Sequence, residues 1–109
     1  MTSIQEKIEN EALRLILCEN PDLLYQVDKA IVKNRKFTGV GFFTDFNVDC
    51  IVSCEEDMTI SSMVGGKLNN NILIGFLLFI KKGKINCLEC YTYDDPWPDV
   101  IESYEIFIH

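Results

Sequence analysis

The residues of this 109-residue chain with the chemistry of metal ligands or nucleophiles are five cysteines. By spacing alone, Cys50-x3-Cys54 and Cys87-x2-Cys90 suggest a four-thiolate zinc site, with Cys18 left over. The second pair lies in a segment with the pattern of a β-strand, where residues three apart point to opposite faces. Neither pair contains the glycine or proline that lets a zinc knuckle turn two thiolates toward one metal. We therefore expect reduced cysteines that mostly serve as small buried side chains, and no metal or other cofactor.

Other catalytic groupings are not expected either. The one histidine, His109, is the last residue, and chain ends rarely hold a catalytic base in a fixed geometry. Adjacent acids at Asp94-Asp95 and Glu55-Glu56-Asp57 could in principle serve acid–base or divalent-metal chemistry, but acids in turns are mostly solvated. The chain has no phosphate-binding loop, dinucleotide fingerprint or nucleophile elbow. The sequence predicts a protein that is not an enzyme.

Charge is distributed unevenly along the chain, whose net charge is −7. Residues 44–66 carry five acids and no base, and residues 85–109 carry six acids and no Lys or Arg. Between them, residues 67–84 carry four lysines and no acid. Two acidic blocks repel nucleic acid and attract cationic partners, although an acidic surface also keeps many proteins soluble.

The elements that must position these groups begin with two helices. Ser3 and Glu6 have capping-box spacing, and apolar residues then recur at helical intervals, which predicts a helix over residues 4–17. Asn20-Pro21 is a typical helix start, and the apolar stripe that follows predicts a second helix to about Lys33. We expect the two helices to form a helical hairpin.

Strand patterns follow the helices. We expect strands over residues 37–48, 50–54, 59–64, 72–80, 85–93 and 103–108, the fourth of them central because it is apolar on both faces. Gly65-Gly66, the three asparagines at 69–71 and Lys82-Gly83 indicate turns, and the prolines at 96 and 98 break the sheet. The predicted fold is α+β, with the helical hairpin packed on a mostly antiparallel, hairpin-linked β-sheet in one domain of residues 1–109. The longest apolar run has nine residues and no secretory leader is present, so we expect a cytoplasmic protein without a membrane span.

The segment around residues 89–98 combines aromatic side chains, carboxylates and a proline-stiffened loop. If Leu88 and Cys90 face the core, alternation places Tyr91 and Tyr93 on the other side of the strand. Tyrosine and tryptophan supply rigid contact area at interfaces, and neighbouring carboxylates pair with Arg or Lys. Alternatively, Trp97 folds back as a lid on the core, as the single Trp of a small domain usually does.

Several motifs resemble a known family. Residues 35–42 read Arg-Lys-Phe-Thr-Gly-Val-Gly-Phe, residues 75–80 read Gly-Phe-Leu-Leu-Phe-Ile and residues 88–93 read Leu-Glu-Cys-Tyr-Thr-Tyr, followed by Pro96-Trp97-Pro98. This is similar to a family of small bacterial proteins with the pattern Arg-x-Phe-Thr-Gly-x-Gly-Phe, Gly-x-x-Leu-Phe-Ile, Leu-Glu-x-Tyr-Thr-Tyr and Trp-Pro. The resemblance implies an immunity protein of a contact-dependent growth inhibition system. Toxins of such systems are often nucleases with basic clefts, which would suit the acidic blocks.

The leading hypothesis is an immunity protein that binds and neutralises a cognate toxin domain of the nuclease class, without contacting nucleic acid or membrane. The residues expected to bind this partner are acids and aromatics of the second half of the chain: Asp45, Asp49, Glu55, Glu56, Asp57, Tyr91, Tyr93, Asp94, Asp95, Trp97 and Asp99. The alternatives are an interaction module for a partner other than a toxin, or a homo-oligomeric scaffold joined through a sheet edge. A zinc-dependent enzyme that uses the cysteines is the third hypothesis.

Overall fold

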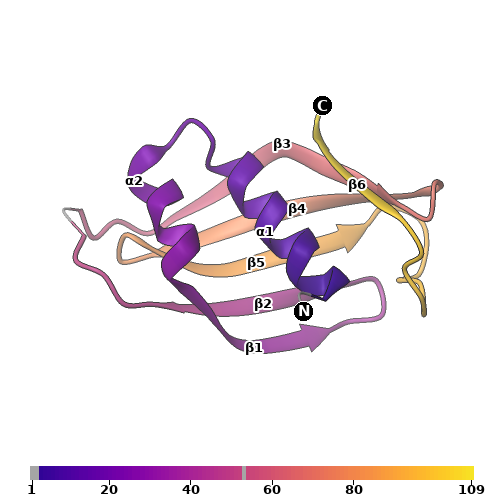
Figure 1. Ribbon diagram of the computed structural model, residues 1–109, viewed down its shortest axis with the longest axis horizontal. Helices are drawn as coiled ribbons and strands as arrows, with labels where there is room; N and C mark the ends of the chain where they lie inside the picture. The colour runs from indigo at the N-terminus through magenta and orange to yellow at the C-terminus, as the bar shows by residue number, and fades with distance from the viewer. Residues whose placement is uncertain (1–2, 53) are drawn as a thin grey trace.

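The computed structural model describes residues 3–52 and 54–109 and shows helices on one face of a sheet (Figure 1). In chain order its elements are α1 (Ile4–Ile16), α2 (Pro21–Leu24), the 3₁₀ helix η1 (Tyr25–Lys29), β1 (Ala30–Phe37), β2 (Gly41–Val48), β3 (Met58–Leu68), β4 (Ile72–Lys81), β5 (Lys84–Thr92) and β6 (Tyr104–Ile108). Every pairing among these strands is antiparallel, and their order across the sheet is β1-β2-β5-β4-β3-β6. The predicted α+β class with a mostly antiparallel sheet is confirmed.

Both helix starts lie where their capping residues predict. The Ser3 hydroxyl accepts the backbone N–H of Glu6 at 3.1 Å, and the Asn20 side chain accepts that of Leu23 at 3.3 Å. Each of these caps satisfies a backbone donor that has no partner within its helix. Pro21 occupies the first turn of α2, where its missing N–H costs nothing.

The end of the second helix differs from the prediction, and the helical hairpin is not confirmed. After the four residues of α2 and the short η1, the chain becomes strand β1 at Ala30. Ile31 and Val32 are β-branched, and β1 pairs with β2 along its length, so its backbone groups find partners in the sheet instead of in a helix. Tertiary pairing overrides the weak helical pattern of this segment.

Three strand boundaries also differ from the prediction. Residues 38–40 form the turn between β1 and β2, with Gly39 at φ +89°, so the expected strand over 37–48 is divided there. Residues 50–52 and 54 lie outside the strands, and residue 53 is outside the described part of the chain. Gly65-Gly66 is not a turn but the middle of β3, paired with Gly75 and Ile74. The central position of β4, the turn at Lys82-Gly83, the break after β5 and the last strand are confirmed.

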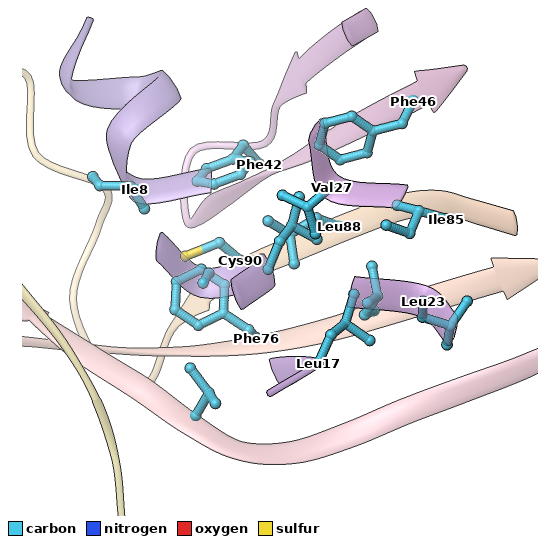
Figure 2. Close-up of a cluster of buried hydrophobic side chains, with 14 of the residues drawn as sticks. Ile8, Leu17, Leu23, Val27, Phe42, Phe46, Phe76, Ile85, Leu88 and Cys90 are labelled. Atoms are coloured by element: carbon cyan, nitrogen blue, oxygen red, sulfur yellow. The ribbon is translucent and has the colours of Figure 1, made fainter. Parts of the chain in front are cut away.

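An apolar core fills the space between the helices and the sheet (Figure 2). Ile8 and Leu17 come from the first helical segment, and Phe42, Phe76 and Leu88 from three neighbouring strands; each is at most 1% exposed. The core leaves the opposite face of the sheet free of helices in the described part of the chain. No helix among the described residues is both long enough and apolar enough to cross a membrane.

Candidate partner-binding surface

The face of the sheet opposite the helices carries no covering element among residues 3–52 and 54–109 (Figure 1). Side chains alternate between the two faces along each strand, so residues next to buried core positions lie on this open face. Met63, Leu73 and Tyr93 are its most exposed large side chains, at 66%, 48% and 54%. We call this surface the open face. Its other members are the buried Cys87 and the half-buried or exposed side chains Lys36, Phe43, Asp45, Lys67, Leu77, Phe79, Glu89, Tyr91 and Phe107.

A row of glycines crosses the open face. Strand register places Gly41, Tyr91, Gly75, Gly65 and Phe107 side by side on β2, β5, β4, β3 and β6. Three of these five positions have no side chain, and neighbouring rings occupy the space above two of them: Tyr91 and Tyr93 at Gly75, and His109 at Gly65. Gly41 is required for the close approach of β5, since a Cβ there would lie 1.9 Å from the carbonyl oxygen of Cys90.

Tyr91 and Tyr93 lie over Gly75 in this row. Their hydroxyl oxygens both come within 2.8 Å of the position that a Gly75 Cβ would occupy, and their ring centroids are 5.7 Å apart with the planes at 83°. Partial burial raises the pKa of the Tyr91 phenol, and the charge and hydrogen bond of Tyr93 raise it further. The two rings thus pack edge to face against each other and over Gly75.

Two carboxylates lie on the open face farther along β2 and β5. Glu89 is two residues before Tyr91, and Asp45 lies at the next same-face position beyond it. Asp45 is opposite Cys87 in the β2–β5 ladder, and Glu89 is opposite Phe43. Burial raises the pKa of the Cys87 thiol to about 12, helped by its hydrogen bond to Asp45 and by the nearby charges of Asp45 and Glu89. The ion pairs between described residues, Arg14–Asp28 and Arg35–Glu9, include neither carboxylate.

A second group of the predicted partner-binding acids lies at one end of the sheet. Asp49, Glu55, Glu56 and Asp57 belong to the connection between β2 and β3, which lies against the β4–β5 turn. There the backbone N–H of Lys82 donates to Asp57 Oδ1 at 2.7 Å, and the N–H of Gly83 donates to the Glu56 carbonyl oxygen. The lysine-rich hairpin of residues 81–84 therefore lies at the same end of the sheet as these acids, and its positive charges offset part of their negative potential.

A third group lies at the opposite end of the sheet. Asp94, Asp95 and Asp99 follow β5, whose nine residues separate them from the lysine hairpin by about 30 Å. Trp97 packs edge-on against Phe42 at 5.5 Å between ring centroids, and its backbone N–H donates to the Gly39 carbonyl oxygen. Trp97 thus folds back onto the core as the alternative interpretation predicted, while Asp94 and Asp95 are exposed.

The structure does not gather the predicted partner-binding residues into one surface. It places Asp45, Tyr91 and Tyr93 on one face, with Asp45 opposite Cys87 and thus four residues along the ladder from Tyr91. It places the remaining acids at two separate ends of the molecule (Figure 1). Phe43 was not expected on this face, and Glu89 was left out of the expected binding residues although alternation along its strand places it on the face of Tyr91 and Tyr93. The period-2 alternation of β2 and β5 indicates which face of its strand each residue occupies, but only the pairing of these two strands shows that Phe43 and Glu89 are neighbours.

The cysteines do not form a cluster. Cys87 is on the open face while Cys90 packs into the core, and burial raises the pKa of the Cys90 thiol as well. Cys18 and Cys54 are exposed and Cys50 is half-buried, all unpaired with another cysteine. Within the described part of the chain, no three His, Cys, Asp or Glu side chains are placed to hold a metal ion.

Comparison with protein-family models, with curated proteins and with solved structures gave no match for this chain. The motifs quoted from the sequence nevertheless meet in space. Gly41, Gly75 and Tyr91 come from three different motifs and are neighbours in the glycine row. Three of the quoted segments thus each contribute one residue to the glycine row of the open face.

Proposed function

We propose that this protein acts by binding another protein, as an immunity protein that neutralises a cognate toxin domain in the bacterial cytoplasm. The observation that carries the proposal is the open face, a sheet surface that no helix of the described residues covers, with exposed Leu73 and Tyr93 and the edge-to-face pair Tyr91–Tyr93. Contiguous exposed apolar surface of this kind marks interaction sites in soluble proteins. The resemblance of the sequence motifs supports the toxin as the class of partner, and the acidic composition favours a basic one.

Co-expression tests this function. The chain is produced with the polypeptide encoded beside it in its genome, and growth and co-purification are measured. We expect the neighbouring polypeptide to arrest growth when expressed alone, and to be co-purified in a stable complex without growth arrest when this chain is present. A neighbouring polypeptide that arrests growth equally in the presence of this chain, with no complex formed, would contradict the proposal.

A second candidate function is self-association through β1. This strand is at the edge of the sheet and exposes Ile31, Val32 and Phe37, so it could pair with another strand. Lys33 and Lys36 and the irregular register between Val32 and Asn34 oppose such pairing. Sedimentation velocity separates the two functions: a monomer across the micromolar range excludes the scaffold, and a concentration-dependent oligomer supports it.

A further inference from the structure

We infer that the open face binds a segment of the partner that carries arginine or lysine among apolar side chains, with Asp45 and Glu89 as the carboxylates that receive the cation. This inference rests on the proposed function. It adds the place of contact and the chemistry of the partner, and it assigns the acidic ends a different role.

The open face has the size and the apolar character of a protein interface. Six strands spaced by about 4.8 Å give a width of about 24 Å, and eight residues of β2 extend about 26 Å. The resulting area, roughly 600 Å² in projection, is comparable to the roughly 800 Å² that each partner buries in a standard interface. Aromatic and aliphatic side chains from five strands lie on it, among them Phe43, Leu73, Leu77, Phe79, Tyr91 and Phe107.

The two carboxylates lie inside this apolar surface. Phe43 is directly opposite Glu89 across the ladder and two residues from Asp45 on the same face of β2. Leu77 pairs with Glu89 from the other side, in the β4–β5 ladder. A covering partner would therefore remove both carboxylates from water, and an unpaired buried charge is costly. Lys36 of this chain is opposite Phe43 in the β1–β2 ladder and can neutralise one of the two charges. A partner that covers this face must therefore supply one further cation here.

Arginine meets this requirement well. Its guanidinium can donate to two carboxylates in one plane and can stack on an aromatic ring. Phe43 is the direct neighbour of Glu89 across the ladder and of Asp45 along β2, so a cation bound by the two carboxylates could also make a cation–π contact with its ring. Lysine supplies the same charge with a less specific geometry.

The acidic residues at the two ends of the sheet are better placed to speed association with the partner than to hold it in the complex. The loop of Glu55, Glu56 and Asp57 lies against the lysine hairpin, and Asp94 and Asp95 are exposed on the opposite end of the molecule. Exposed charges at a rim mainly raise the association rate and are screened by salt. We therefore assign binding to the open face and steering to the ends.

The first arm of the test uses a probe that does not depend on the identity of the toxin. The ¹⁵N-labelled protein is titrated with the peptide acetyl-Arg-Leu-Arg-Trp-Arg-amide, and amide chemical-shift changes are mapped. We expect the largest changes at the amides of Phe43, Asp45 and Glu89. Changes confined to residues 55–57 or 94–99, or no changes at millimolar peptide, would overturn the inference.

The second arm uses the neighbouring polypeptide and two matched double variants. Asp45→Asn with Glu89→Gln removes both charges of the open face, and Asp94→Asn with Asp95→Asn removes two charges from one end. Asparagine and glutamine keep the side-chain shapes, and Trp97 fluorescence with the urea midpoint verifies that each variant folds. We expect the open-face variant to bind at least about 30-fold more weakly through faster dissociation, and the end variant to change Kd by less than about 3-fold through slower association.

The outcomes separate the inference from the proposed function. If the wild-type protein does not bind the neighbouring polypeptide, the proposed function fails, and the peptide arm still decides whether the open face takes a cation. If the wild-type protein binds and the open-face variant binds equally well, while the end variant is weakened, the function stands and the inference is wrong.

Discussion

The carboxylate of Glu9 on α1 accepts two hydrogen bonds from the guanidinium of Arg35 on β1, from Nε at 2.8 Å and from Nη2 at 2.7 Å. Glu9 is only 3% exposed, and it also accepts the hydroxyl of Thr44 at 2.6 Å and the amide of Gln5 at 2.9 Å. This network joins the first helix to the two strands at one edge of the sheet. It explains how a charged residue lies on the buried side of α1, because each of its oxygens has a donor.

Replacement of Glu9 by alanine should lower the free energy of unfolding by about 3 kcal/mol, because Arg35 and Thr44 lose their partner at a buried site. Urea denaturation followed by Trp97 fluorescence measures this change. The matched control is Arg14→Ala, which breaks the exposed Arg14–Asp28 pair and should cost less than about 1 kcal/mol. Equal effects of the two substitutions would contradict a structural role for the Glu9 network.

The loss of stability on replacing a glycine by alanine should increase as the space available for the new Cβ decreases. Gly41→Ala places its Cβ against the backbone of Cys90 and should cost about 3 kcal/mol or prevent folding. Gly75→Ala contacts the movable ends of Tyr91 and Tyr93, so we expect about 1–2 kcal/mol and a change in tyrosine fluorescence. Gly39→Ala meets no atom within 4 Å and is strained only by its positive φ, at about 1 kcal/mol. Thermal unfolding of the three variants tests this order, and a less stable Gly39→Ala than Gly41→Ala would refute it.

The β4–β5 hairpin should depend on Gln26, which is 1% exposed. Its amide donates to the Gly83 carbonyl oxygen at 2.9 Å, and its oxygen accepts the backbone N–H of Ile85 at 3.0 Å. Gln26→Ala leaves both groups without this partner, so we expect a loss of about 2–3 kcal/mol and faster hydrogen exchange of the Ile85 amide. Exchange at Ile85 as slow as in the wild-type protein would show that the turn does not need the glutamine.

Thiol reactivity should follow burial. Cys18 and Cys54 are exposed and should react readily with a disulfide reagent at pH 8, whereas Cys87 and Cys90 should react only after unfolding. Burial is the largest cause of the raised pKa of both thiols, which therefore remain protonated in the folded protein.

The same pKa values predict a dependence of stability on alkaline pH. The unfolded chain releases these protons above the ordinary thiol pKa of 9.0, while the folded protein keeps them up to about pH 12 at Cys87. The contribution of these thiols to stability is therefore complete below about pH 9 and decreases as the pH rises above it. Cys87→Ser should flatten this alkaline decrease in urea titrations between pH 8 and 10; an unchanged slope would contradict it.

Local rules were sufficient for several parts of the fold. The caps at Ser3 and Asn20 begin the helices where expected, because a capping hydrogen bond involves residues only three apart. The turn at Lys82-Gly83 has positive φ at both residues, 53° and 75°, as the tight hairpin turn requires. The prediction of a turn at Gly65-Gly66 was wrong. The glycines there allow the backbone of β6 to approach β3 closely, because a Cβ at Gly66 would lie 2.4 Å from the Glu105 carbonyl oxygen.

By itself, the sequence determined the fold class, the helix starts, the central strand β4 and the face on which Tyr91 and Tyr93 lie, because these depend on neighbours within a few residues. Only the tertiary structure decided that residues 30–37 form an edge strand, that Arg35 reaches Glu9 across 26 positions of sequence, and that Asp45 and Glu89 share one face while Asp57 and Asp94 lie at opposite ends. Strand order and register depend on contacts between residues far apart in the chain, and neither charge nor periodicity along one segment contains that information.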